Sequence, residues 1–164
     1  MTGVQTCALP ICRPSLQSVT IPDSVTSIGR SAFSGCSSLQ SVTIPESVTI
    51  IKGNPFSGCP TRVINHSNHF TIFEDNLYTS DRRKLISYLS KGGNFIIPDS
   101  VTNIGDHAFE SCSSLQSVTI PDSVTSIGNG AFEGCGSLQS IFISHKTYDR
   151  LKAELYSSKI KLTD

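Results

Sequence analysis

Four cysteines recur at the same place in a repeated sequence, and their side chains are the ones best suited to chemistry. Cys36 and Cys59 are 23 residues apart, and so are Cys112 and Cys135. If the repeats stack, paired cysteines would lie one strand spacing apart, about 4.7 to 4.9 Å, which a disulfide accepts. Cysteine is also a small, readily buried apolar residue. Because one follows a phenylalanine in each copy, we predict a column of buried thiols rather than disulfides.

The other side chains that could act on a substrate or hold a metal ion show no matching pattern. No pair of C-x-x-C motifs indicates a zinc site, and the sequence contains neither a G-x-S-x-G nucleophile turn nor a phosphate-binding glycine loop. The histidines lack the spacing of metal ligands and are expected at the surface. We therefore predict no catalytic site, no cofactor and no metal site. The histidines are His66, His69, His107 and His145.

Four acidic residues share one position of the repeat, directly after a proline. Their carboxylates would line up on stacked copies and could attract a cation, but turn formation also explains them, and we favour the turn. These residues are Asp23, Glu46, Asp99 and Asp122. Asn65 begins an N-H-S sequon, which is a glycosylation acceptor only in a secreted eukaryotic protein.

The elements that would position these side chains come from a 23-residue repeat. The copy at 115–137 reads LQSVTIPDSVTSIGNGAFEGCGS, and residues 16–29 are identical to residues 115–128. A fixed period in the twenties indicates a solenoid in which each coil contacts mainly its neighbours. The other complete copies span 16–38, 39–61 and 92–114, and a fifth begins at 138–144.

Each copy is expected to form two short strands and one helical turn. Leu115, Val118 and Ile120 would point inward from the first strand, while the polar residues between them point outward. A proline turn leads to the second strand, and the A-F-x-x-C segment suits one helical turn that buries its phenylalanine. A single coil could not offset the loss of backbone entropy, about 1 to 2 kcal/mol per residue. Folding therefore requires stacking.

The consensus L-x-x-V-x-I-P-x-x-V-x-x-I-G-x-x-A-F-x-x-C resembles the BspA-like leucine-rich repeat family over most of residues 16–144. Local departures are Lys52 at a glycine position, Pro55 at an alanine position and a degenerate start at Gly92. The resemblance implies a curved, β-rich repeat solenoid with short parallel strands along one side and single helical turns elsewhere. It also implies a surface or secreted protein of a host-associated microbe, with an adhesive role in some members.

Residues 62–91 interrupt the period. Three short segments of alternating apolar and polar residues, separated by turn-forming residues, predict a β-hairpin or small meander. Tyr78 and Tyr88 in this insertion could belong to a protruding recognition element. The alternative, which we favour, is a hairpin that packs these rings onto the flank of the solenoid. The three segments are 70–73, 76–79 and 84–88.

Residues 145–164 have the composition of a terminal cap. Apolar residues recur at helical spacing within 145–157, and Thr147 is a candidate N-cap. An amphipathic helix followed by the apolar segment 160–162 would cover the exposed core and unpaired strand edge of the last coil. The alternative is a helix that binds a partner.

Residues 1–11, MTGVQTCALPI, resemble the translation of a common short-read sequencing adapter. We interpret residues 1–12 as an artefact or a disordered terminus, leave Cys7 and Cys12 out of the cysteine argument, and expect the native N-terminus to be missing. The formal net charge of +0 argues against a nucleic-acid partner. No apolar run reaches the roughly 18 residues of a membrane-spanning helix.

The outward face of the first strands is the candidate interaction surface. Rows of serine and threonine would make it flat, uncharged and extended, so it could bind a protein or glycan through many weak contacts or serve only to keep the sheet soluble. With two tyrosines of the insertion, the candidate residues are Ser18, Thr20, Ser41, Thr43, Ser117, Thr119, Phe142, Tyr78 and Tyr88.

Together with the family resemblance, which implies a cell-surface or secreted microbial protein, these features lead us to expect a non-catalytic binding or adhesion module that is a fragment of a larger protein. A passive spacer that presents another domain is the alternative. We expect residues 13–144 to form the solenoid, with the hairpin-containing insertion at about 62–91, and residues 145–164 to form the C-terminal cap.

Overall fold

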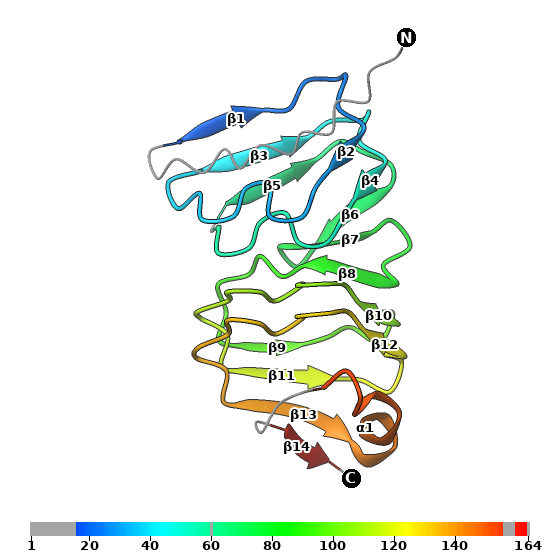
Figure 1. Ribbon diagram of the computed structural model, residues 1–164. Helices are drawn as coiled ribbons and strands as arrows, with labels where there is room; N and C mark the ends of the chain where they lie inside the picture. The colour runs from blue at the N-terminus through cyan, green and yellow to red at the C-terminus, as the bar shows by residue number, and fades with distance from the viewer. Residues whose placement is uncertain (1–15, 60, 156–159, 164) are drawn as a thin grey trace.

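The computed structural model describes residues 16–59, 61–155 and 160–163, so the adapter-like segment with Cys7 and Cys12 lies outside the described residues. The chain winds into a β-solenoid of about six turns whose coils stack along one axis, from β1 at one end to β14 at the other (Figure 1). Valine, isoleucine and threonine favour such strands. No helix in the described part of the chain is long and apolar enough to cross a membrane.

Parallel strands one repeat apart pair in register along one side of the solenoid. The 23-residue period places equivalent residues opposite each other, so Val19 pairs with Val42, and Val118 with Ile141. Buried residues alternate with outward ones along these strands, as predicted. The strands are β1 (Ser18–Thr20), β3 (Ser41–Ile44) and β5 (Arg62–Asn65) in one sheet, and β9 (Asn94–Ile96), β11 (Ser117–Ile120), β13 (Ser140–Ser144) and β14 (Ile160–Thr163) in another.

A second side of each repeat carries a two-residue strand followed by a tight turn. The turns close with short-range backbone hydrogen bonds, and the phenylalanines of neighbouring coils, buried except for the half-buried Phe132, stack on each other. The ring centroids of Phe33 and Phe56 are 5.4 Å apart, and those of Phe109 and Phe132 are 5.0 Å apart. The second strands are β2 (Ser27–Ile28), β4 (Ile50–Ile51), β10 (Asn103–Ile104) and β12 (Ser126–Ile127).

The insertion forms a three-stranded meander, the second of the two predicted arrangements. β6 (Phe70–Phe73) pairs with β7 (Asn76–Thr79), and β7 pairs with β8 (Lys84–Ser87), both in antiparallel fashion. β8 then pairs in parallel with β10 of the next coil. Figure 1 shows these strands between the two halves of the stack rather than projecting from it.

The two faces of β7 and β8 pack against different hydrophobic cores. Leu77 and Ile86 belong to the core of the N-terminal half, whereas Tyr78 and Leu85 belong to the core of the C-terminal half. This division follows from the strand geometry, in which successive side chains point to opposite faces. We call β7 and β8 the septum, because they separate the two cores and contribute side chains to both.

Tyr78 and Tyr88 do not lie on the surface, so their inclusion among the candidate interaction residues is wrong. Tyr78 is 0% exposed and Tyr88 is 4% exposed. Tyr78 points from the septum into the C-terminal core, and the ring of Tyr88 contacts those of Phe95 and Phe109 at centroid distances of 4.9 and 5.3 Å. Burial raises the pKa of each phenol to about 12. The rings therefore pack into the solenoid, which was the alternative interpretation.

Asn54 joins the septum to the coils on both sides of it. Its side chain is buried, and its Nδ2 donates a hydrogen bond of 3.0 Å to the carbonyl of His107. Its Oδ1 accepts hydrogen bonds from the hydroxyl of Ser87 at 2.6 Å and from the backbone N–H of Phe56 at 2.9 Å. The insertion lacks an A-F-x-x-C turn, so this network connects the turn of the copy at 39–61 with that of the copy at 92–114.

The C-terminal helix α1 spans His145–Leu151, and its N-cap is Ser144 rather than the predicted Thr147. The hydroxyl of Ser144 accepts a hydrogen bond of 3.2 Å from the backbone N–H of Thr147, which lies in the first turn of the helix. Leu151 and Leu155 are buried in the C-terminal core. α1 is shorter than the predicted 145–157, and residues 156–159 lie outside the described residues.

Asp122 anchors α1 to the preceding coil. Its carboxylate accepts hydrogen bonds from the hydroxyls of Ser144 and Thr147, and Arg150 donates to its backbone carbonyl at 2.9 Å. These two hydroxyl hydrogen bonds hold the pKa of the Asp122 carboxyl below its ordinary value, and the bond from Ser144 has the larger effect. The acidic turn position therefore acts in helix docking at this coil.

Replacing Asn54 with alanine should lower the free energy of unfolding by roughly 2 to 3 kcal/mol, because buried polar groups on three segments lose their partners. Urea unfolding followed by circular dichroism measures the change. The control is Asn129→Ala, which removes an exposed asparagine from the turn of the copy at 115–137. It should change the free energy of unfolding by less than about 0.5 kcal/mol. Equal stabilities for the two variants would contradict the role of Asn54 as a junction.

Replacing Asp122 with asparagine should lower the melting temperature at neutral pH, and the difference from the unmodified chain should shrink in acid. The folded-state pKa is depressed, so the stabilisation is present above the ordinary aspartate pKa of about 3.9 and is lost as the pH falls through the folded value. Thermal scans from about pH 7 to pH 3 measure this dependence. The control is Asp99→Asn, at the same turn position one coil earlier. If the melting temperatures of the two variants depend on pH in the same way, the role of Asp122 in docking α1 is contradicted.

Candidate functional site

The outward face of the C-terminal sheet carries a row of side chains from four neighbouring strands. Thr119 of β11 lies opposite Ile96 of β9 and Phe142 of β13, and Phe142 lies opposite Lys161 of β14. Ile96 is 72% exposed and Phe142 is 37% exposed, whereas Thr119 between them is half-buried. We call these four residues the outer row. The strands that carry them are adjacent in Figure 1.

The N-terminal sheet has a shorter version of this arrangement. Thr43 of β3 lies opposite Thr20 of β1 and Ile64 of β5, and Ile64 is 38% exposed. The predicted hydroxyl residues thus lie on the expected face, where those of β1 are exposed and the others are half-buried. The exposed ones are Ser18 and Thr20, and the half-buried ones are Ser41, Thr43, Ser117 and Thr119.

Ile64 and Ile96 were missed in the sequence analysis. Both occupy the threonine position of the S-V-T-I strand, in copies that read R-V-I-N and N-F-I-I. Aligning these irregular copies with the regular ones would have identified them. The regular repeats therefore place hydroxyls on this face, and the irregular ones add apolar side chains.

A cleft lies where the regular stacking is interrupted. It has a volume of about 460 Å³, and its lining includes Arg62 of β5, Asp75 of the hairpin turn and Lys91. A smaller cavity of about 270 Å³ shares the segment Leu89, Ser90 and Lys91 with it. The insertion therefore leaves a concave, charged region beside the edge strand β5.

The cysteine column consists of thiols. Cys59 donates a hydrogen bond of 3.2 Å to the carbonyl of Cys36, and Cys135 donates one of 2.9 Å to the carbonyl of Phe109. Burial raises the pKa of Cys112 to about 12. A thiol with so high a pKa is protonated at neutral pH and is a poor nucleophile. Cys36, Cys59 and Cys135 are buried as predicted, whereas Cys112 is half-buried, and the column packs neighbouring coils together.

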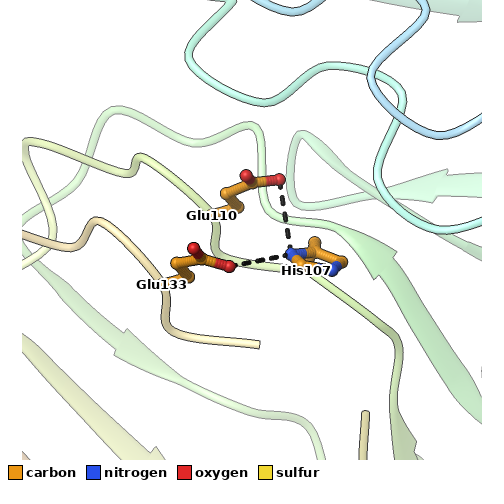
Figure 2. A group of neighbouring side chains, drawn as sticks. All are labelled: His107, Glu110 and Glu133. Atoms are coloured by element: carbon orange, nitrogen blue, oxygen red, sulfur yellow. Dashed lines mark ion pairs between the residues drawn. The ribbon is translucent and has the colours of Figure 1, made fainter. Parts of the chain in front are cut away.

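The prediction that all four histidines lie at the surface is wrong for His107. His66, His69 and His145 are exposed, but His107 is only 6% exposed. Its Nδ1 lies 3.5 Å from Oε2 of Glu110 and 3.5 Å from Oε2 of Glu133. Figure 2 shows both carboxylates directed at this one ring nitrogen. The sequence offered no signal of ligand spacing, because Glu133 belongs to the next coil.

Comparison with protein families gives a match over nearly the whole chain. The family model described as the BspA type leucine rich repeat region matches in six copies, over residues 11–92 and 87–164. No curated protein matches.

Comparison with solved structures gives matches to bacterial repeat proteins. A leucine rich cell surface protein from Faecalibacterium prausnitzii is 38% identical with a TM-score of 0.65, over 89% of this chain and 37% of that chain. A leucine-rich repeat protein from Eubacterium ventriosum is 24% identical with a TM-score of 0.61, over 79% of this chain and 42% of that one. The pneumococcal vaccine antigen PcpA is 21% identical with a TM-score of 0.61, over 77% of this chain and 39% of that chain. The last two matches show the fold alone, and this chain spans less than half the length of each of the three.

Proposed function

Because the chain belongs to the BspA-type leucine-rich repeat family, we propose that it is a non-catalytic binding module of a larger cell-surface or secreted protein and that its ligand is a protein. The F. prausnitzii structure supports the cellular location, since it is described as a cell surface protein and is 38% identical to this chain. The match covers 37% of that protein, so the proposal concerns the repeat module alone.

The observation that carries this proposal is the outer row. Neighbouring strands are about 4.8 Å apart, so Ile96 and Phe142, one strand on either side of Thr119, can contact the same partner. Burying exposed apolar surface contributes about 25 cal/mol per Å². The paired strands hold both side chains in place before binding, which reduces the entropy lost when a complex forms.

The chemistry of the row favours a protein over a glycan. Ile96 has the most exposed large apolar side chain among the described residues, and it offers a sugar neither a hydrogen bond nor a ring face. Apolar and aromatic side chains at the centre of a contact, with charge at its rim, are typical of protein interfaces. Lys161 at the end of the row supplies such a charge.

A passive spacer accounts less well for the same residues. A spacer needs only a polar surface, and the threonine of the regular copies already provides one at this position. Exposed isoleucine and phenylalanine side chains in one row promote aggregation unless a partner covers them. The departure from the hydroxyl pattern therefore supports binding.

The test is a screen of the immobilised chain against a panel of purified extracellular proteins and a glycan array. At least one protein should bind, and the double variant Ile96→Ser, Phe142→Ser should weaken that binding by about tenfold or more, because two contact residues are removed. Surface plasmon resonance measures the affinities.

Ile50→Ser is the matched control, because Ile50 is 51% exposed but lies on β4, in the other strand column. It should leave the affinity unchanged. Two results would contradict the proposed surface. One is binding to glycans alone, and the other is an equal loss of affinity in Ile50→Ser and in the outer-row double variant. An absence of any binding would favour the spacer.

A further inference from the structure

A three-residue cluster lies on the turn side of the C-terminal half, away from the outer row. His107 and Glu110 belong to the tight turn after β10, and Glu133 occupies the position of Glu110 in the next coil. The stacking that aligns the sheets therefore brings the two carboxylates to one edge of one imidazole (Figure 2).

The contacts within the cluster are too long for hydrogen bonds. Nδ1 of His107 lies 3.5 Å from each of two carboxylate oxygens, and this buried nitrogen has no hydrogen-bond partner. The His107 side chain is 8% exposed, and Oε2 of Glu110 is likewise buried without a hydrogen-bond partner. Buried polar atoms are seldom left unpaired in folded proteins. These two atoms, which lack hydrogen bonds, face each other at 3.5 Å.

The spacing of these atoms matches that of ligands sharing one metal ion. Ligands at about 2.0 to 2.2 Å from a tetrahedral ion lie roughly 3.3 to 3.6 Å from one another. The three ligand atoms of the cluster all lie within 4.8 Å of one another, and two of the three separations are 3.5 Å. Glu133 is 63% exposed, so solvent reaches the cluster and can supply a fourth ligand.

Gly130 makes room for the imidazole. It occupies the position of His107 in the next coil, and a Cβ there would lie 2.5 Å from Cε1 and 2.6 Å from Nδ1 of His107. In the first repeat the same position is Ser31, which has a backbone φ of 59°, close to the 57° of His107. The pair of His107 and Gly130 is thus a local departure from the repeat that creates the cluster.

We propose that His107, Glu110 and Glu133 bind a divalent transition-metal ion of the zinc class. One imidazole nitrogen and two carboxylate oxygens form a ligand set that zinc accepts with an open fourth position. The ion would link two consecutive coils, and its binding would stabilise the folded chain. The competing arrangement is a protonated imidazole that pairs with both carboxylates and needs no ion.

The test uses the full chain with Cys7 and Cys12 replaced by serine, so that these two thiols cannot contribute to zinc binding. After EDTA treatment, titration with zinc chloride against a chromophoric chelator should show one ion per chain. The melting temperature should rise by roughly 5 °C or more at saturating zinc. Magnesium and calcium at the same concentration should produce no rise, because they prefer sites made only of oxygen ligands.

Two variants and one control locate the site. His107→Ser introduces the residue found at this position in the first repeat, and Glu133→Gln changes an exposed side chain, so both should fold. Each should weaken zinc binding by about tenfold or more. The control, His66→Ser, removes an exposed histidine and should leave the zinc affinity unchanged.

X-ray absorption at the zinc edge should show only nitrogen or oxygen neighbours at about 2.0 to 2.2 Å, with the outer-shell scattering of one imidazole and no sulfur neighbour. Two results would overturn the proposal. One is that the chain with only the two cysteine replacements binds no zinc and has the same melting temperature with zinc as with EDTA. The other is that this chain and its His107→Ser variant bind zinc with equal affinity.

Discussion

Parallel pairing in register between strands one repeat apart is the interaction on which the other features of this protein depend. Because Val118 lies opposite Ile141, the rest of each coil is also aligned with its neighbour, and the phenylalanine rings and thiols stack on the inside. The same alignment sets Thr119 between Ile96 and Phe142 on the outside. No coil of this length can bury a core alone, so the core exists only between coils.

The septum shows how the chain accommodates a segment that does not fit its period. The insertion supplies strands whose two faces are both apolar, and each face completes a different core. Asn54 then satisfies the polar groups at the junction. As a result the first-strand sheet is divided into two, with edge strands β5 and β9 at the division and a cleft beside it.

Residues that match the consensus build the stack, and residues that depart from it supply the candidate functions. The identical segments 16–29 and 115–128 each form a first strand, a proline turn and a second strand, in different halves of the solenoid. Ile96 and Phe142 replace threonine on the outward face, and His107 stands beside Gly130 at a position that is serine in the first repeat. Both candidate sites therefore lie in a few irregular copies on a regular scaffold.

The family, the solenoid, the strand positions and the hairpin could be predicted from the sequence by itself, because a strict period and alternating apolar residues leave few ways to bury a core. The hydroxyl rows were predictable for the same reason. Three features were decided only by the tertiary structure. Tyr78 is buried because both faces of the septum are covered, Ser144 is the N-cap because Asp122 fixes the hydroxyls at that corner, and His107 meets Glu133 because stacking joins residues of different coils. Each depends on contacts between segments far apart in the chain, which local periodicity does not encode.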